Sequence, residues 1–357
     1  MAGPAALAAV LGEGWDARRD RLDATGAVVA VTDRERTLAV VALGAADRSG
    51  APMTAGTRFQ IGSVSKSFAA ILALQEERAG RLDLAAPVTR FLPWFEVPSR
   101  FGPIAVHHLL SHTSGLATGT EFTGEAHAAL LALRETEVGF APGERFLYSN
   151  DAYKAVGLIL EGVTGRRYPD LLRERILAPL GMTSSDPEIT LPARAGSAPG
   201  HRRALDDRPD HPGQPLVEAP WVPSWTADGS ILSTGEDLCA YARMLLGRGT
   251  APDGTAVLPE PAFARMLEPR ATDPDEPDAP YGFGIRTTRV EGRLHAGHTG
   301  SMIGHVARLS LDLDAGVGAV VLLNGASGRD LAARDDLARA ALAGARALAE
   351  GREPPAV

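Results

Sequence analysis

Two pairs of strand-like segments at opposite ends of this 357-residue chain constrain its fold more than any other feature. GAVVAVTD (26–33) and TLAVVALG (37–44) are apolar, β-branched runs separated by a short polar segment, a pattern typical of a hairpin. HVARLSLDLDA (305–315) and GVGAVVLLNG (316–325) form a second pair, and the Ala/Leu/Arg-rich segment after them (329–351) has helical periodicity. We therefore predict that the two ends of the chain form one α/β layer.

The middle of the chain is predicted to be mainly helical. SFAAILALQEERAG (67–80) is an apolar helix with charges in its last turns, and it ends at Gly80, a residue typical of the position after a helix. The Pro/Asp-rich stretches 186–224 and 269–280 are expected to be long loops, and such loops in an enzyme often line or cover a site. Further helical patterns lie at 125–136, 151–164, 167–177 and 235–247.

Charge and composition exclude several classes of protein. The net charge of −8 and the lack of any Lys/Arg-rich tract argue against nucleic-acid binding. No apolar run reaches the roughly 18 residues of a membrane span, and no positively charged segment precedes the short N-terminal apolar patch, so we expect a cytoplasmic protein without a membrane partner.

The single cysteine, Cys239, excludes an intrachain disulfide and is expected in a helix core. No P-loop or dinucleotide-binding glycine motif is present, so no cofactor is expected.

Lysine is rare in this chain, and one of its two lysines stands beside a serine. Of the 36 lysines and arginines only Lys66 and Lys154 are lysines. Arginine stays protonated at working pH, whereas burial can lower the pKa of a lysine enough for it to act as a base. In FQIGSVSKSF (59–68), Lys66 follows Ser63 by three residues, which places both side chains on one helix face. Ser63 is a candidate nucleophile with Lys66 as its base; the alternative is an ordinary N-cap serine beside a solvated lysine.

A second motif, PGERFLYSND (142–151), places Tyr148 and Asn150 between a Pro-Gly turn and an apolar helix. A tyrosine near an ammonium group can act as a general base and then as the acid that protonates a leaving group. Asn150 offers both a donor and an acceptor to a substrate amide. The structural alternative is a core aromatic residue followed by an asparagine helix cap.

A third motif, GHTGS (297–301), follows a predicted strand. Glycine lets a strand edge approach a ligand closely. His298 and Thr299 could bind an anionic or carbonyl group, and the N–H of Ser301 could form an oxyanion hole together with that of Ser63. The alternative is a plain glycine turn.

The order of these motifs, S-x-x-K, then Y-x-N, then H-T-G, resembles the serine β-lactamase and penicillin-binding-protein superfamily. The resemblance is to the branch of class C β-lactamases, DD-carboxypeptidases, D-amino peptidases and related esterases. It extends over roughly residues 25–330 and includes the flanking phrases LLSHTSGL, LAPLGMTSS, STGEDLCAYARMLL, YGFGI and VVLLNG.

This resemblance implies an α/β fold of the α+β type. An antiparallel sheet flanked by N- and C-terminal helices would be formed by residues 1–62 and 280–357, with a mainly helical domain of residues 63–279 inserted and the active site at the seam. The implied site residues are Ser63, Lys66 and Tyr148 for catalysis, and Asn150, His298, Thr299, Gly300 and Ser301 for substrate and oxyanion binding.

The predicted function is that of a serine hydrolase that forms a Ser63 acyl-enzyme from an ester or amide of a small molecule or a D-amino-acid compound. An esterase or a D-amino peptidase or amidase is favoured. The alternatives are a biosynthetic transacylase, a weak β-lactamase and a non-catalytic penicillin-binding-type protein. Histidine stands where β-lactamases of this branch carry the lysine of K-T-G, and because histidine is largely neutral at pH 7 it should hold a β-lactam carboxylate less well.

Other candidate sites have weaker support. His108 and His112 stand four residues apart, but no H-E-x-x-H motif or further ligand at metal-site spacing accompanies them, so no metal is expected. His112 is expected to hydrogen-bond to backbone in a loop behind the site. No G-x-S-x-G nucleophile elbow is present. Lys154 is expected on a helix surface, and Trp221 and Trp225 either line an acyl pocket or anchor their loop.

Overall fold

The computed structural model of the chain describes residues 3–118, 124–204, 215–325 and 331–356. The helices are α1 (Pro4–Leu22), α2 (Ser65–Arg78), α3 (Val106–Leu110), α4 (Ala126–Ala132), α5 (Asn150–Thr164), α6 (Tyr168–Leu172), α7 (Gly235–Leu246), α8 (Glu260–Leu267) and α9 (Leu331–Ala349). The strands are β1 (Ala24–Asp33), β2 (Thr37–Gly44), β3 (Phe59–Gln60), β4 (His201–Arg203), β5 (Leu216–Glu218), β6 (Leu232–Ser233), β7 (Arg286–Val290), β8 (Arg293–Met302), β9 (His305–Asp312) and β10 (Val317–Gly325).

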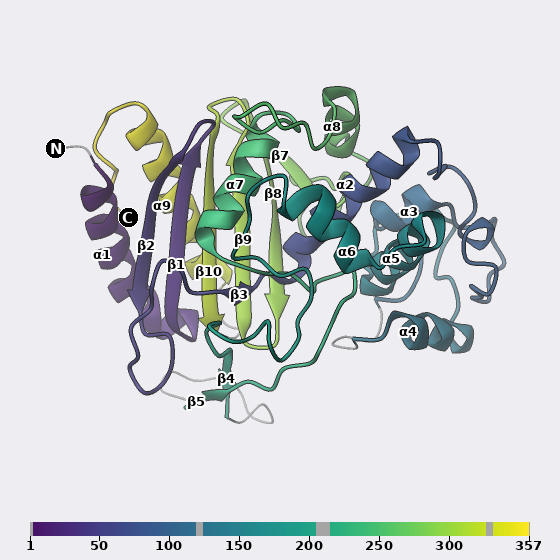
Figure 1. The fold of residues 1–357 in the computed structure, drawn as a ribbon, viewed down its shortest axis with the longest axis horizontal. Helices are drawn as coiled ribbons and strands as arrows, with labels where there is room; N and C mark the ends of the chain where they lie inside the picture. Colours follow the sequence, from purple (N-terminus) through teal and green to yellow (C-terminus); the bar gives the residue numbers. More distant parts are fainter. Residues whose placement is uncertain (1–2, 119–123, 205–214, 326–330, 357) are drawn as a thin grey trace.

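The central sheet has six strands in the order β2-β1-β10-β9-β8-β7 (Figure 1). Every neighbouring pair is antiparallel, and β1 from the N-terminal end pairs with β10 from the C-terminal end, with Val29 opposite Val321. The predicted α/β layer built from both ends of the chain is therefore confirmed.

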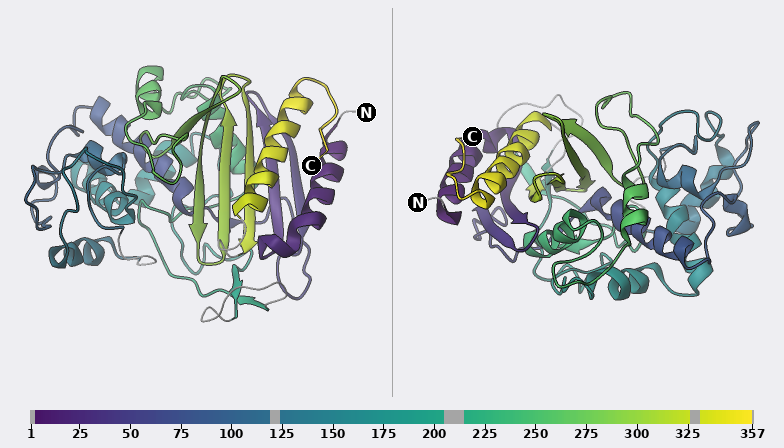
Figure 2. Two further views of the ribbon diagram at one scale, coloured as in Figure 1. Left: turned by 180° about the vertical axis from the view of Figure 1, so that it is seen from behind. Right: turned by 90° about the horizontal axis from the view of Figure 1, so that it is seen from above.

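Helices cover both faces of this sheet, which explains why β1 reads as a continuous apolar run. On one face, Val29 and Val31 belong to a core that α1 and α9 close, as Figure 2 shows from behind. On the other face, Val28 and Ala30 join the larger core, where α7 packs against β1 and β10. The expected antiparallel sheet flanked by N- and C-terminal helices is the observed fold.

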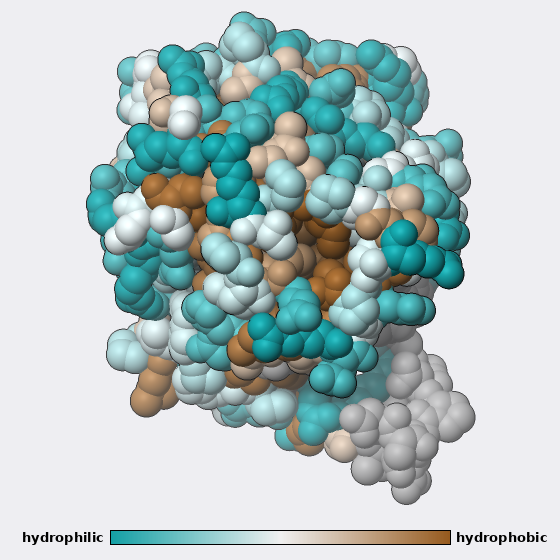
Figure 3. Space-filling model, turned by 90° about the vertical axis from the view of Figure 1, so that its right-hand side faces the viewer, coloured by the Kyte–Doolittle hydropathy of each residue, from teal (hydrophilic) through white to brown (hydrophobic). Residues whose placement is uncertain are grey.

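The larger core continues from the sheet into the helices of the middle of the chain. Helix α2 is buried over most of its length and contacts α5, α6 and α8. Figure 3 looks onto this helical end, where apolar side chains form the floor of hollows between hydrophilic ones. Because α7 belongs in sequence to this region yet packs on the sheet, the division into residues 1–62 and 280–357 against 63–279 stays a prediction. None of the helices among the described residues has the length and apolarity needed to cross a bilayer.

Most predicted elements are present with shifted ends. Helix α2 begins at Ser65, two residues before the predicted start. The segment 125–136 is α4 followed by a short 3-10 turn, and the segment 167–177 is α6 continued by a π-helical turn. The predicted loop 186–224 contains the hairpin of β4 and β5, while its residues 205–214 lie outside the described part of the chain. Cys239 is buried in α7, as expected.

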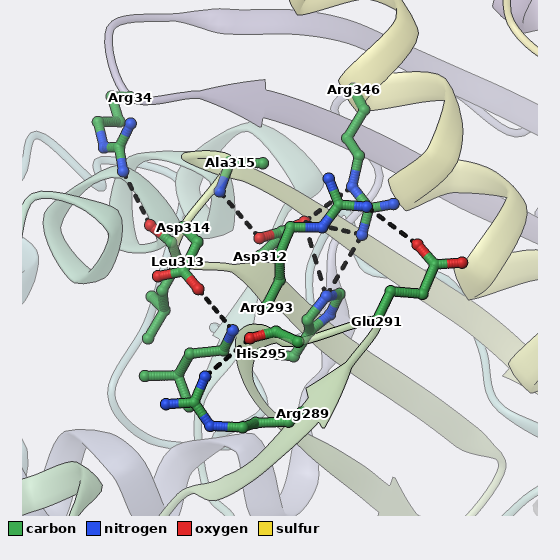
Figure 4. A network of polar contacts seen from close by, with 12 residues as sticks. Arg34, Arg289, Glu291, Arg293, His295, Asp312, Leu313, Asp314, Ala315 and Arg346 are labelled. Atoms are coloured by element: carbon green, nitrogen blue, oxygen red, sulfur yellow. Dashed lines mark hydrogen bonds and ion pairs between the residues drawn. The ribbon is translucent and has the colours of Figure 1, made fainter.

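A buried carboxylate fixes α9 against the sheet (Figure 4). Asp312, at the end of β9, is fully buried and accepts hydrogen bonds from Nε of Arg346 at 2.8 Å and from the Ala315 N–H at 2.9 Å. The Nη2 atom of Arg346 lies 2.7 Å from the same carboxylate, and His295 and Arg293 of β8 lie 3.6 Å away. The C-terminal helix is thereby joined to two adjacent strands of the sheet.

Asp312→Asn should lower the free energy of unfolding by about 3 kcal/mol, because it leaves the Arg346 guanidinium without its carboxylate in a largely buried site. Asp336→Asn is the control on the same helix: Asp336 is one-third exposed and pairs with the exposed Arg339 and, at 3.8 Å, with Arg18, so solvent screens both pairs and the expected loss is under about 1 kcal/mol. Urea unfolding of the two variants measures both values. Equal losses would contradict the role given to the buried network.

Candidate active site

Ser63 lies in the 3-10 turn η1 (Gly62–Val64) that connects β3 to α2. The turn requires glycine at position 62, which has a φ of +51° and whose added Cβ would come 2.7 Å from the backbone nitrogen of Ser301. Ser63 itself is partly exposed, while Lys66 is completely buried. The partly exposed serine thus lies at the N-terminal end of α2, where the helix dipole favours developing negative charge.

The Lys66 side chain connects three separate parts of the chain. Its Nζ lies 3.0 Å from Oγ of Ser63, 2.8 Å from Oδ1 of Asn150 and 2.8 Å from the backbone oxygen of Asp228. Oxygens that can accept hydrogen bonds thus surround the nitrogen. An ammonium group can donate to all three.

The same acceptors determine where the lone pair of a neutral Lys66 amine would point. A neutral amine has two N–H bonds and one lone pair. The backbone oxygen of Asp228 can only accept, and Oδ1 of Asn150 is the acceptor end of its amide. If both keep their hydrogen bonds, the lone pair is left toward Oγ of Ser63, and the geometry is that of a base accepting the serine proton.

Tyr148 lies beside Lys66 and is supported by His112. The Nζ of Lys66 is 4.9 Å from the centroid of the Tyr148 ring, and the His112 and Tyr148 rings are 4.1 Å apart at an interplanar angle of 31°. His112 sits in a loop with a φ of +56°, and its Nδ1 accepts the N–H of Ser149 at 3.1 Å. Its predicted backbone contact behind the site is confirmed. Burial, together with the charge of Lys66, holds the pKa of His112 well below its usual range, so the ring is neutral.

The GHTGS segment lies in the second half of strand β8, and only its first half pairs with β7. Strand β7 pairs with β8 only as far as Gly297. On the other side of β8, strand β9 pairs with it from His295 to Met302. The remaining edge runs against the turn that carries Ser63: a Cβ on Gly300 would come 1.9 Å from the oxygen of Ile61 and 3.1 Å from the nitrogen of Ser63. Glycine at position 300 therefore lets the strand edge and the turn that carries Ser63 come together.

His298 is buried beneath this edge, whereas Thr299 is partly exposed and Ser301 is exposed. Its Nε2 lies 2.8 Å from the hydroxyl of Tyr281, and its Nδ1 contacts the backbone oxygen of Thr299. Burial, reinforced by Lys66, lowers the pKa of His298 to about 3, so the ring carries no charge at neutral pH. Both ring nitrogens thus have partners inside the protein, and the direct contact with a substrate anion that the sequence suggested stays a prediction.

Sequence reasoning missed two residues of this site. Asp228 contributes through its backbone oxygen, which leaves no signal in side-chain chemistry. Tyr281 opens the YGFGI phrase that belongs to the resemblance, but no chemical role was assigned to it. The only signal for Tyr281 is that a buried His298 needs a hydrogen-bond partner, and the sequence does not show which residue this partner is.

The expectation that Lys154 lies on the surface is wrong. Lys154 is 1% exposed and its Nζ lies 2.9 Å from Oδ1 of Asp151, which is 2% exposed. Both residues stand in the first turns of α5, directly after Asn150, and charges are buried there only because they pair. Both lysines of the chain therefore lie in the interior.

Trp221 and Trp225 have different environments. Trp221 packs against the small cluster of Ile189, Ala193 and Leu232, with the Arg194 guanidinium 4.6 Å from its ring centroid, so it anchors its loop. Trp225 is 38% exposed and lines a cavity of about 150 Å³ beside α4 and α5. Among the described residues, no group of three or more His, Cys, Asp or Glu side chains could hold a metal ion.

Comparison with known proteins agrees with this geometry. A profile of the β-lactamase family matches residues 14–343. The chain belongs to this family. Penicillin-binding protein 4 of Amycolatopsis lactamdurans is 32% identical, over 88% of this chain and 84% of that protein. Esterase EstB of Burkholderia gladioli is 33% identical over 52% of this chain and 54% of its own length. The D-amino acid amidase of Ochrobactrum anthropi SV3, solved with L-phenylalanine, superimposes with a TM-score of 0.77 at 25% identity and covers 97% of this chain and 98% of that one.

Buried neutral histidines predict that acid destabilises the fold. Burial lowers the pKa of His305 to about 3, as it does that of His298, whereas a histidine in the unfolded chain titrates near 6.5. Between these values the unfolded chain binds more protons, so stability falls as the pH falls below about 6.5. His305→Gln should reduce the dependence of unfolding free energy on pH by about 1 kcal/mol per pH unit between pH 5 and 6, measured by urea unfolding.

The exposed His127 provides the control, since His127→Gln removes a histidine whose side chain is 59% exposed. That variant should keep the wild-type pH dependence. If His305→Gln keeps it as well, buried histidines do not account for the acid sensitivity.

Proposed function

We propose that the protein is a serine hydrolase that acts on ester or amide bonds through an acyl-enzyme on Ser63. The observation that carries the proposal is the 3.0 Å contact between Oγ of Ser63 and Nζ of Lys66, with the amine held by two further fixed acceptors. A nucleophile within hydrogen-bond reach of a base that a third group orients is the arrangement required for covalent catalysis.

In the proposed acylation step, Oγ of Ser63 attacks the substrate carbonyl carbon and its proton passes to Lys66. The C–O bond forms as the carbonyl π electrons move to oxygen, giving a tetrahedral oxyanion. The oxyanion then re-forms the carbonyl double bond as the bond to the leaving group breaks. The leaving oxygen or nitrogen takes a proton from Tyr148, which Lys66 replaces with the proton it received from Ser63. Water then attacks the acyl-enzyme by the same route and releases the acid. Asn150 both orients Lys66 and offers its amide N–H₂ to the substrate.

The backbone N–H groups of Ser63 and Ser301 are proposed to hold the oxyanion. The close approach of Gly62 to Ser301 and of Gly300 to Ser63 supports this pairing, since it brings the backbone of Ser301 next to that of the Ser63 turn. Backbone donors of this kind are already oriented before the charge develops, and each typically contributes a factor of about 10²–10³ to the rate.

For the substrate, we favour a neutral ester or a D-amino-acid amide. The relatives include proteins named as an esterase and a D-amino acid amidase, and the buried, uncharged His298 offers no cation to a substrate carboxylate. The same observation makes a β-lactamase the weaker alternative. A transacylase would use the same acyl-enzyme and differ only in the acceptor, and a non-catalytic binding protein would need neither Ser63 nor Lys66 in this geometry.

The test compares kcat/KM for a p-nitrophenyl short-chain ester with that for D-alanyl and L-alanyl p-nitroanilides, with Ser63→Ala as the blank. We expect turnover that depends on Ser63. Ester turnover without anilide cleavage assigns an esterase or acyl transferase, and anilide cleavage selective for the D form assigns a D-amino peptidase. Activity that survives in Ser63→Ala would contradict the proposed function.

A further inference from the structure

The two hydrogen bonds of His298 determine where its proton is. The backbone oxygen of Thr299 can only accept, so Nδ1 must carry the hydrogen in that contact. A neutral imidazole has one N–H, which leaves Nε2 as an acceptor. The hydroxyl of Tyr281, 2.8 Å away, must therefore donate to Nε2. A single tautomer of His298 satisfies both partners.

The charges around His298 favour the same state. The cations that act on it are Lys66 on α2 and Arg286 on β7, and both disfavour an imidazolium. Of the other titratable neighbours in the aromatic cluster, His112 is itself held neutral. Burial raises the pKa of Tyr281 well above its ordinary value, so its phenol keeps the proton that it donates. Tyr148 faces the ring of His298 at 6.4 Å between centroids. The Tyr153 hydroxyl donates to the Leu110 oxygen and also contacts the Tyr281 hydroxyl, so it competes with Nε2 of His298 for the single Tyr281 proton.

Tyr281 also connects the two halves of the site. Its ring contacts His112 at 4.9 Å and Phe146 at 5.7 Å between centroids, and it meets the Tyr148 ring edge-on at 6.5 Å. The backbone of Tyr281 is fixed in turn by its N–H bond to the Ala271 oxygen at 2.7 Å. The ring of Tyr281 thus contacts His112, which packs against Tyr148, and its hydroxyl contacts His298 on strand β8.

We propose that Tyr281 is a positioning residue that holds His298 as a neutral, Nδ1-protonated imidazole. This bond fixes the edge of β8 that carries Gly300 and Ser301, and it keeps positive charge away from that edge. The consequence for specificity, which rests on the proposed function, is a preference for acyl compounds that have no carboxylate facing β8.

Side-chain ¹⁵N NMR of the wild-type protein tests the bond without any assay of activity. The chain has nine histidines, and the signal missing from His298→Gln identifies His298. We expect His298 to be neutral and protonated on Nδ1 throughout pH 5–8. A signal protonated on Nε2, or a titration near the ordinary histidine pKa, would overturn the proposal.

Tyr281→Phe tests the function of the bond, because it removes the hydroxyl and keeps the ring. We expect kcat on the best substrate of the panel to fall about tenfold with KM changed less than twofold, as the loss of one buried hydrogen bond predicts. The pKa of His298 should rise, since the neutral ring loses its donor, and the acid limb of the pH–rate profile should shift upward with it. The control is Tyr241→Phe, which removes a buried hydroxyl that donates to Ser67 at 2.8 Å and should leave kcat and the profile within twofold.

A double-mutant cycle separates positioning from general damage. In the His298→Gln background, Tyr281→Phe should change kcat less than twofold, because the bond is already absent. If Tyr281→Phe costs the same factor in both backgrounds, or leaves the pH profile unmoved, Tyr281 is not a positioning residue that acts through His298. Labelling by a fluorophosphonate in wild type, Tyr281→Phe and His298→Gln distinguishes this failure from failure of the proposed function. Labelling on Ser63 in all three leaves the proposed function intact even where the role of Tyr281 fails, whereas no labelling of Ser63 in the wild type contradicts the proposed function itself.

Discussion

The hydrogen bonds of the Lys66 amine are the interaction on which the rest of the site depends. Ser63 lies on the turn before α2, Asn150 begins α5, and Asp228 belongs to the loop before β6, and each provides an oxygen to the same nitrogen. A buried charge is tolerated only where hydrogen bonds replace its hydration. The three segments therefore have to meet at one point if Lys66 is to be buried, and meeting there also places Oγ of Ser63 beside the Lys66 amine.

The sheet provides the fourth side of this site. Because β7 pairs with only the first half of β8, the second half keeps an edge that can approach the turn of Ser63. Gly62 and Gly300 make the approach possible by lacking a Cβ. The central sheet, which uses both ends of the chain, holds β8 through β9 and β10, and Asp312 fixes α9 behind it. The geometry around Ser63 thus depends on contacts between segments that are far apart in sequence.

Local patterns in the sequence were enough to predict much of this structure. The β-branched runs predicted the hairpin of β1 and β2, and the three-residue spacing of Ser63 and Lys66 predicted that their side chains lie together, although Ser63 lies in the 3-10 turn before the helix. What could not be predicted depends on tertiary contacts. The burial of Lys154 follows from its pairing with Asp151, the contribution of Asp228 is a backbone oxygen, and the partner of His298 lies on a separate segment at Tyr281. None of these has a signature in periodicity or composition. The close approach of β8 to the turn of Ser63 likewise depends on β8 extending beyond its pairing with β7, which is a property of the sheet as a whole.

The central claim is that Ser63 is a nucleophile activated by Lys66. Intact-protein mass spectrometry during reaction with a fluorophosphonate, followed by peptide mapping, tests it most directly. We predict one adduct per chain, on Ser63, with a rate that falls by about 10²–10⁴ in Lys66→Arg because arginine cannot accept the serine proton. Ser63→Ala should form no adduct. An adduct on another residue, or an equal labelling rate in Lys66→Arg, would contradict the account.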